Sequence, residues 1–249
     1  MHTEPPLTPA QTLRWHLDAG VDETIGETPV NRYAQPAKAA PKSVTTMQAA
    51  EPASSAHLAI ACNSLDQLRA AMESYDGCAL KRTCQKTVFA DGNPKAELML
   101  VGEAPGADED RIGLPFVGAS GKLLDAMLAA IGLDRSSVYI ANVVPWRPPG
   151  NRKPEPSEVE LCLPFITRQI ELVDPKLLLL LGGAPTSALL ARTDSITRLR
   201  GQWIDYSSNR LSHPIPALPT FHPAYLLRTP AHKKEAWRDL LAVKQRLSR

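Results

Sequence analysis

The sequence has few cysteines and no long hydrophobic run, and these absences exclude several classes of protein. Four cysteines in 249 residues are too few and too scattered for a disulfide scaffold, so we expect a reduced, cytoplasmic protein. The longest aliphatic run, KLLLLLGG from Lys176 to Gly183, is far too short to span a bilayer. The N-terminus lacks a basic segment followed by an apolar run, so we expect no secretion signal and no membrane association.

The chain also lacks an excess of either charge. Its 28 basic and 26 acidic residues leave a net charge of +2. If nucleic acid is a partner, the basic residues must therefore be concentrated on one face.

Three regions differ in composition. Residues 1–27 contain a short helical segment at Thr8–Gly20, with Thr8 as its cap. Residues 28–60 are rich in Ala, Pro, Ser and Thr, and they cannot bury enough apolar surface to offset their ordering entropy. We therefore predict a flexible linker over 28–60 and a catalytic domain over 61–249.

From about Cys62 onward, strand-like and helix-like segments alternate, which predicts a mainly parallel sheet with helices on both faces. The expected strands are 96–102, 137–144, 176–182, a weaker one around 200–206, and the start of 217–228. The expected helices are 64–75, 120–133, 157–173, 185–191 and 233–247. Ser157 and Glu160 form the expected capping box of the third helix.

Ligands of such sheets bind at the carboxyl ends of the strands, where this sequence places Glu103, Asn142 and His222. Glu103 follows a buried strand and precedes a Gly/Pro-rich bend. A carboxylate held there can position or deprotonate water, or coordinate a metal. His222 is aimed by the Pro that follows it, and either a functional role or a loop-capping role fits.

The stretch from Val101 to Leu128 combines acids with turns that resemble phosphate-binding turns. It is not a nucleotide-binding loop, because Phe116 stands where that pattern needs Gly and Leu123 where it needs Ser or Thr. The amides of Ser120 and Gly121 at the helix start can hold a single phosphate, or they can simply belong to a helix cap.

Four ordered motifs resemble those of the family 4 uracil-DNA glycosylases. They are GEAPGADEDRIGLPFVGASGKLLDAML, YIANVVPWRPPGNRKP, LLLLLGGAPTSALL and FHPAYLLR, and the match runs from about Tyr75 to Leu247. The resemblance implies a three-layer α/β/α fold with a central, mainly parallel four-stranded sheet. It also implies a monofunctional enzyme that flips uracil out of DNA and hydrolyses its N-glycosidic bond with water as the nucleophile, leaving an abasic site.

The resemblance also implies roles for individual residues. Uracil would stack on Phe116, Asn142 would read its Watson–Crick edge, and the amides of Ala104 and Gly106 would face the base. His222 would donate a hydrogen bond to O2 of the departing base. Glu103, with Glu109 or Asp110, would stabilise the cationic sugar or orient the water. The implied DNA contacts are the wedge Leu226, Leu227 and Arg228, and the phosphate-binding residues Ser120, Gly121, Lys122, Arg147, Arg152, Lys153 and Arg228.

The sequence departs from the family at the [4Fe–4S] cluster that family 4 members usually carry. Only Cys78 and Cys162 match its ligand positions, while Tyr75 and Trp146 occupy the other two. We therefore predict that the cluster is absent and that aromatic packing fills its volume. A zinc site built from Cys78, Cys84, Cys162 and a His is a less favoured alternative.

Two other functions remain open from the sequence. One is a broader glycosylase for deaminated bases such as hypoxanthine and xanthine. The other is a non-catalytic protein that binds lesions or abasic sites. In each case the expected partner is DNA containing uracil or another damaged base, and the expected state is a monomer.

Overall fold

The structure, a computed structural model, describes residues 8, 10, 14, 18 and 54–248. The chain divides into two units, Met1–Gln48 and Ala49–Arg249. The expected helix at Thr8–Gly20 and the expected linker as far as residue 53 lie outside the described residues, apart from those four positions. Within the described part, no helix is both long enough and apolar enough to cross a membrane.

Six strands form a single sheet within residues 54–248, in the order β1-β3-β2-β4-β6-β5. The four central strands run parallel to one another. They are β3 (Tyr139–Asn142), β2 (Leu98–Gly102), β4 (Leu177–Leu181) and β6 (Ile215–Thr220). The edge strands β1 (Asp91–Gly92) and β5 (Ile204–Tyr206) pair antiparallel with β3 and β6. The predicted α/β class and parallel centre are confirmed, and β1 is an edge strand that the sequence did not predict.

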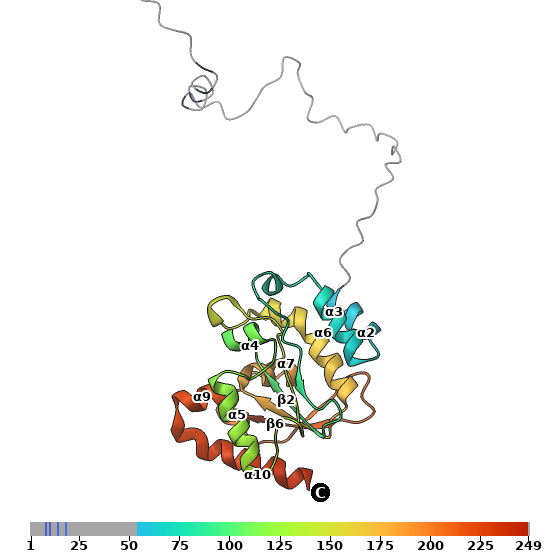
Figure 1. The fold of residues 1–249 in the computed structure, drawn as a ribbon, viewed down its shortest axis with the longest axis vertical. Coiled ribbons are helices and arrows are strands. Elements are labelled where there is room, and N and C mark those ends of the chain that lie inside the picture. The colour runs from blue at the N-terminus through green and yellow to red at the C-terminus, as the bar shows by residue number, and fades with distance from the viewer. Residues whose placement is uncertain (1–7, 9, 11–13, 15–17, 19–53, 249) are drawn as a thin grey trace, which may run out of the picture. The chain divides into compact units, whose positions relative to one another are not determined.

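Helices cover both faces of this sheet (Figure 1). Along β2, Met99 and Val101 point to the face covered by α3 (Leu65–Ser74) and α6 (Pro156–Val173). Leu98 and Leu100 point to the opposite face, with α5 (Ala119–Ala130) and α10 (Lys233–Leu247). The alternation follows from the two-residue period of a strand. It explains why the central strands are apolar along most of their length, since both of their faces are buried.

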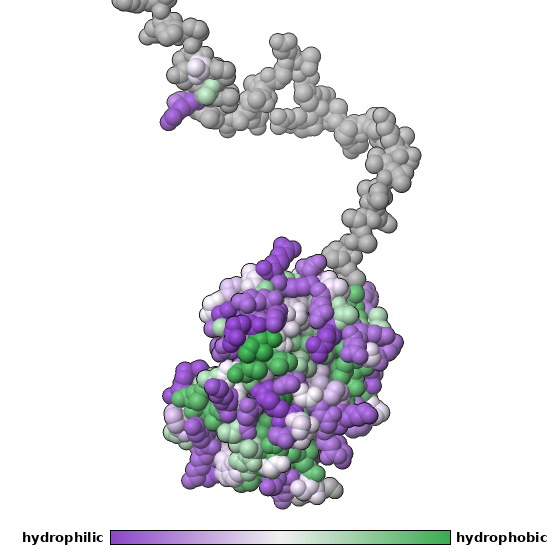
Figure 2. All heavy atoms as spheres, in the orientation of Figure 1, coloured by the Kyte–Doolittle hydropathy of each residue, from purple (hydrophilic) through white to green (hydrophobic). Residues whose placement is uncertain are grey.

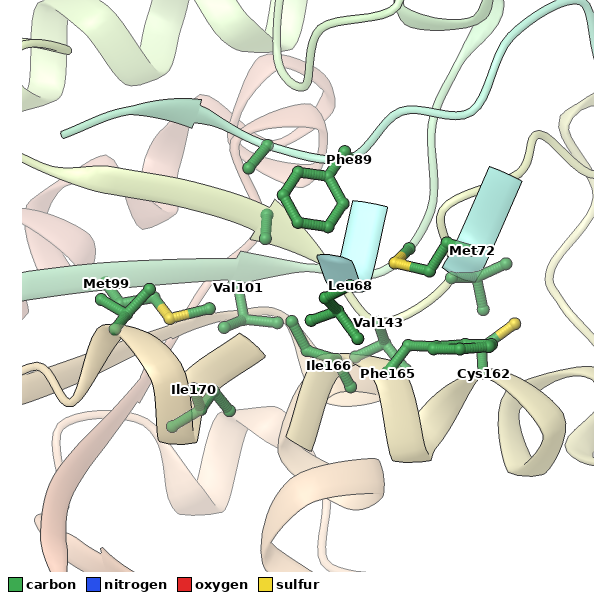
Figure 3. Packing of buried hydrophobic residues seen from close by; sticks show 14 of the residues in the cluster. Leu68, Met72, Phe89, Met99, Val101, Val143, Cys162, Phe165, Ile166 and Ile170 are labelled. Carbon is green, nitrogen blue, oxygen red and sulfur yellow. The ribbon is translucent and has the colours of Figure 1, made fainter. Parts of the chain in front are cut away.

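The face toward α6 contains the larger core cluster, part of which is drawn in Figure 3. Phe165, Ile166 and Ile170 of α6 lie against Met99 and Val101 of the sheet. These side chains are at most 1% exposed. The apolar residues of α6 recur three or four positions apart and so form the face that contacts the sheet.

Helix α2 (Ser55–Ala61) corrects the predicted end of the linker at residue 60. Ser54 caps the helix by accepting a hydrogen bond from the His57 amide at 3.3 Å. Arg168 of α6 donates to the carbonyl oxygen of Cys62 at 2.9 Å and so ties the end of α2 to α6. Because small residues form much of the buried side of α2, its sequence resembles that of a linker.

Two further local predictions were wrong. The capping box of α6 consists of Glu155 and Glu158, not Ser157 and Glu160, since Pro156 already occupies the first turn. The acidic stretch after β2, expected as a loop, forms α4 (Ala107–Ile112). The remaining elements are the helices α7 (Gly183–Leu190), α8 (Ile196–Leu199) and α9 (Pro223–Arg228), and the 3-10 turns η1 (Ala79–Arg82), η2 (Pro149–Asn151) and η3 (Pro230–His232).

An aromatic cluster occupies the region where the sequence retains only two of the family's four cysteines. The ring of Tyr75 stacks on Trp146 with centroids 6.3 Å apart and meets the edge of Phe165 at 5.3 Å. Trp146 donates through Nε1 to Thr87 Oγ1 at 3.1 Å, so its one polar atom is satisfied. The cluster links the segment after α3 to α6.

Replacement of Trp146 by Ala is expected to lower the free energy of unfolding by about 4 kcal/mol, because a large side chain with 0% exposure is lost and a cavity remains. Urea denaturation measures this loss. The matched control is Trp237→Ala, whose side chain is 40% exposed and whose loss should cost about 1 kcal/mol or less. Equal losses in the two variants would contradict a structural role for the aromatic cluster.

Candidate active site

A cavity of about 480 Å³ opens at the carboxyl edge of the sheet. Glu103 follows β2, Asn142 ends β3, and His222 follows β6, so three of the four parallel strands deliver these side chains to one cavity. The other predicted residues in its lining are Ala104, Gly106, Glu109, Phe116, Ser120, Arg152, Lys153 and Arg228. The structure therefore brings most of the predicted site residues together.

Asn142 holds a buried acceptor that has no partner. Its side chain is 5% exposed, and its Oδ1 atom makes no hydrogen bond among the described residues. A buried polar atom without a partner costs about 1–3 kcal/mol. This cost is relieved when a ligand in the cavity presents an N–H group to the oxygen.

Gly102 is a site residue that sequence reasoning placed at a strand end without giving it a role. It pairs with Asn142 in the register of β2 and β3. A Cβ atom at Gly102 would lie 2.3 Å from Asn142 Oδ1 and 2.6 Å from Phe116 Cζ. Only glycine therefore leaves room for the amide and the aromatic ring to lie beside one another.

His222 is neutral and keeps a proton on Nε2 that a ligand could accept. Its Nδ1 accepts from the Ala224 amide at 3.1 Å, which places the proton on Nε2. Burial, followed by the positive charge of Arg228, lowers the pKa of His222 to about 4, although Glu109 opposes this shift. The ring lies 5.5 Å from that of Phe116, with a tilt of 32°. A ligand that stacks on Phe116 lies within reach of a neutral donor.

Glu103 is the carboxylate that remains available to a ligand. Burial raises its pKa above the usual value, and the nearby charge of Lys153 partly offsets that effect. The charge of Lys153 favours the ionised form that a base or a stabilising anion requires.

Glu109 and Asp110, both predicted as catalytic, differ in their position relative to the cavity. Glu109 lines the cavity, but its Oε1 accepts from the amides of Val117 and Gly118, both at 2.9 Å. Asp110 is 2% exposed and does not line the cavity, and it accepts from the backbone of residues 85 and 86 at 2.7 and 3.2 Å. Both carboxylates fasten loops, and of the two only Glu109 borders the cavity.

The predicted role of the Gly106 amide is corrected as well. Gly106 lines the cavity, yet its N–H donates to Glu109 Oε2 at 3.1 Å and is not free for a base. Gly121 is buried in α5, where a Cβ atom would lie 1.8 Å from the carbonyl oxygen of Phe116. Its observed contribution is steric, since it lets α5 approach the backbone of Phe116.

The predicted DNA-binding residues are distributed unevenly. Ser120, Arg152 and Arg228 line the cavity, whereas Lys122 is an exposed residue of α5 outside it. Arg152 donates two hydrogen bonds, of 2.8 and 2.6 Å, to the carboxylate of Glu158. Part of its guanidinium is therefore occupied by a residue in the first turn of α6.

The predicted wedge is reduced to one of its two leucines. Leu226 is 1% exposed and belongs to the core, while Leu227 is 43% exposed. Figure 2 shows a small apolar patch in the region that Figure 1 labels α9, the helix that carries Leu227.

Several lining residues were not predicted from the sequence. They are Pro105, Pro148, Asn151, Pro154, Ala224 and Tyr225. Asn151 adopts a positive φ of 56° directly after Gly150, at 64°. The Pro-Pro-Gly-Asn turn signal marks this bend in the sequence, but it does not reveal that the bend borders the cavity.

The residues at the family's iron–sulfur positions do not fit a four-thiolate cluster. Cys78 and Cys162 are fully buried and hydrogen-bonded to each other, and Tyr75 lies against them. That hydrogen bond, together with burial, raises the pKa of Cys162, which stays a neutral thiol. Within the described residues, no group of three His, Cys, Asp or Glu side chains is arranged to hold a metal ion.

Comparison with known proteins identifies one family. The model of the uracil DNA glycosylase superfamily matches residues 89–241. The type-4 uracil-DNA glycosylase of Archaeoglobus fulgidus is 42% identical over 184 residues, covering 72% of this chain and 92% of that protein. That of Saccharolobus solfataricus is 40% identical over 191 residues, covering 75% of this chain and 88% of that protein. That of Thermotoga maritima is 41% identical over 152 residues, covering 61% and 77%.

His222 is expected to titrate near pH 4 and to carry its proton on Nε2 above that pH, which NMR of labelled histidine measures. Because folding lowers this pKa from 6.5, the stability that the neutral ring contributes is complete above about pH 6.5 and is lost as the pH falls toward about 4. In His222→Gln this part of the pH dependence should disappear. Titration of His222 near pH 6.5 would contradict its desolvation.

Proposed function

Because the chain belongs to the uracil DNA glycosylase superfamily and is similar to its type-4 members, we propose that it removes uracil from DNA by hydrolysing the N-glycosidic bond. One observation carries the proposal: the unpaired Asn142 oxygen, the neutral His222 donor and the Phe116 ring border one cavity. A base must leave the duplex stack before its glycosidic bond becomes accessible, and such a cavity suits a flipped base.

Recognition of uracil would depend on the amide of Asn142. Its oxygen accepts from N3–H of uracil, and its NH₂ group donates to O4. Cytosine has an acceptor at N3 and an amino group at position 4, so both hydrogen bonds would be lost. A buried polar atom left unpaired by the wrong base is a strong source of discrimination.

The bond between N1 of uracil and C1′ of the sugar breaks with its electron pair moving to the base. Negative charge then accumulates on O2, where the Nε2–H of His222 donates a hydrogen bond without giving up its proton. The sugar becomes an oxocarbenium ion, which the carboxylate of Glu103 stabilises. Water attacks C1′, Glu103 orients it or accepts its proton, and the uracil anion later takes a proton from solvent.

The positive side chains around the cavity suit the DNA backbone. Lys153, Arg152 and Arg228 lie in its lining, although the chain as a whole is nearly neutral. Charges gathered at the mouth of a cavity attract phosphates locally. The proposal includes a monomer that works in the cytoplasm.

Three substitutions test the site in a cleavage assay on an oligonucleotide with one uracil. Glu103→Gln and His222→Ala should each lower kcat by about a hundredfold or more, because each removes a group that acts on developing charge. Asn142→Asp should lower kcat/KM for uracil by a similar factor, since its carboxylate cannot donate to O4.

Glu97→Gln is the matched control for Glu103→Gln. Glu97 directly precedes β2, the strand that Glu103 follows, and it forms an exposed ion pair with Lys176. This variant should retain the wild-type rate. Wild-type rates in all three site variants would overturn the assignment of the site. Duplexes with hypoxanthine or xanthine reveal a broader specificity, and binding without release of any base would favour a non-catalytic lesion-binding protein.

We also propose that the protein works without an iron–sulfur cluster. Anaerobically purified protein is expected to contain less than about one tenth of an iron atom per chain, because the cluster requires four thiolates and only two stand at its positions. Iron and acid-labile sulfide assays, together with visible absorbance, provide the measurement. Iron and sulfide near four per chain would refute the proposal.

A further inference from the structure

The loop that carries Phe116 has an unfavourable backbone conformation. Phe116 has a φ of 53°, in the left-handed region that non-glycine residues seldom adopt. Its side chain is 4% exposed and lines the cavity. An aromatic residue stays in this conformation only where the surroundings hold it.

An anion holds one side of the loop. Glu109, at the start of α4, accepts hydrogen bonds from the amides of Val117 and Gly118, both at 2.9 Å. These are the two amides directly after Phe116. The carboxylate therefore fixes the chain as it leaves the bend.

A cation holds the other side of the loop. Arg135 lies after α5 and does not line the cavity. Its guanidinium donates to the carbonyl oxygens of Phe116 and Pro115, the latter at 3.1 Å. The planar fork of Arg suits two neighbouring carbonyls, and the smaller ammonium of Lys cannot reproduce it.

Two carboxylates fix Arg135 itself. Asp91 of β1 accepts from Nη1 at 2.6 Å, and Asp125 of α5 accepts from Nε at 2.8 Å. The Arg135 side chain is 26% exposed, so these charge-assisted bonds are only partly screened by solvent. The guanidinium thus connects the sheet edge and α5 to the loop.

We propose that Arg135 is a positioning residue that, together with Glu109, holds the Phe116 loop so that the ring can stack on the flipped base. This inference rests on the proposed glycosylase function for its catalytic consequence. Arg135 acts through Phe116, and it touches neither the base nor the sugar. The role also explains why the short strand β1 and the middle of α5 present carboxylates to the same guanidinium.

Kinetics of Arg135→Lys test this role. The variant should lose roughly tenfold in kcat/KM on uracil-containing DNA, the equivalent of one charge-assisted hydrogen bond. In a Phe116→Ala background the same substitution should have no further effect, because the ring that it positions is already missing. A loss of equal size in both backgrounds, or no loss in either, would overturn the inference.

Two controls separate positioning from general destabilisation. In Arg168→Lys, another guanidinium that binds a backbone carbonyl and a carboxylate is replaced in α6, and kcat/KM should stay at the wild-type value. Asp125→Asn weakens one brace of Arg135 at a half-exposed position and should cause a smaller loss in the same direction. All rates are compared at a temperature where thermal unfolding shows each variant folded.

Amide hydrogen exchange tests the loop independently of activity. Exchange at Val117 and Gly118 should become about tenfold faster or more in Arg135→Lys, and it should not change in Arg168→Lys. If the wild type releases no uracil while this exchange accelerates, the proposed function fails and the loop restraint stands. If the wild type is active and both exchange and kcat/KM are unchanged in Arg135→Lys, the inference fails and the function stands.

Discussion

Burial of side chains at the carboxyl edge of the sheet is the constraint on which the site depends. The four parallel strands end together, and the loops that follow β2, β3 and β6 close around the same space. This burial keeps His222 neutral, raises the pKa of Glu103 and leaves Asn142 Oδ1 without a partner. Contact with bulk water would return both pKa values toward their usual values and would give Asn142 Oδ1 a hydrogen-bond donor. The same desolvation strengthens every electrostatic contact to a bound base, so one feature of the fold provides both the strain and the chemistry.

The acidic segment after β2 shows how context divides similar side chains between structure and chemistry. Glu109 and Asp110 lie within the short helix α4, where their oxygens are occupied by backbone amides of other segments. Glu103 stands before that helix, at the end of a strand, and faces the cavity instead. All three residues are acidic. What differs is which amides lie within reach, and that depends on tertiary contacts between residues 8–25 positions apart.

The periodic part of the fold was predictable from the sequence, and the non-local part was not. The run Leu177–Leu181 predicts a strand buried on both faces, and the motif order places Glu103, Asn142 and His222 at strand ends. The edge strand β1 has only two residues and no periodicity to detect. Nothing near Arg135 in the sequence marks it as a positioning residue. Its four partners come from three separate segments, which only the fold brings together. Local patterns therefore locate the cavity, but they do not reveal what holds its walls.

The aromatic cluster connects segments that the family resemblance implies are joined by a metal cluster in other members. Tyr75 and Trp146 occupy the positions where the family resemblance implies two metal-binding thiolates, and their rings are stacked beside the buried pair Cys78 and Cys162. Metal–thiolate bonds connect segments at points, whereas packed rings connect them over an area and depend on close fit. Trp146 follows β3 only a few residues after Asn142. Close packing there restrains the segment that follows Asn142, so the rings stabilise the position of the Asn142 amide as well as the core.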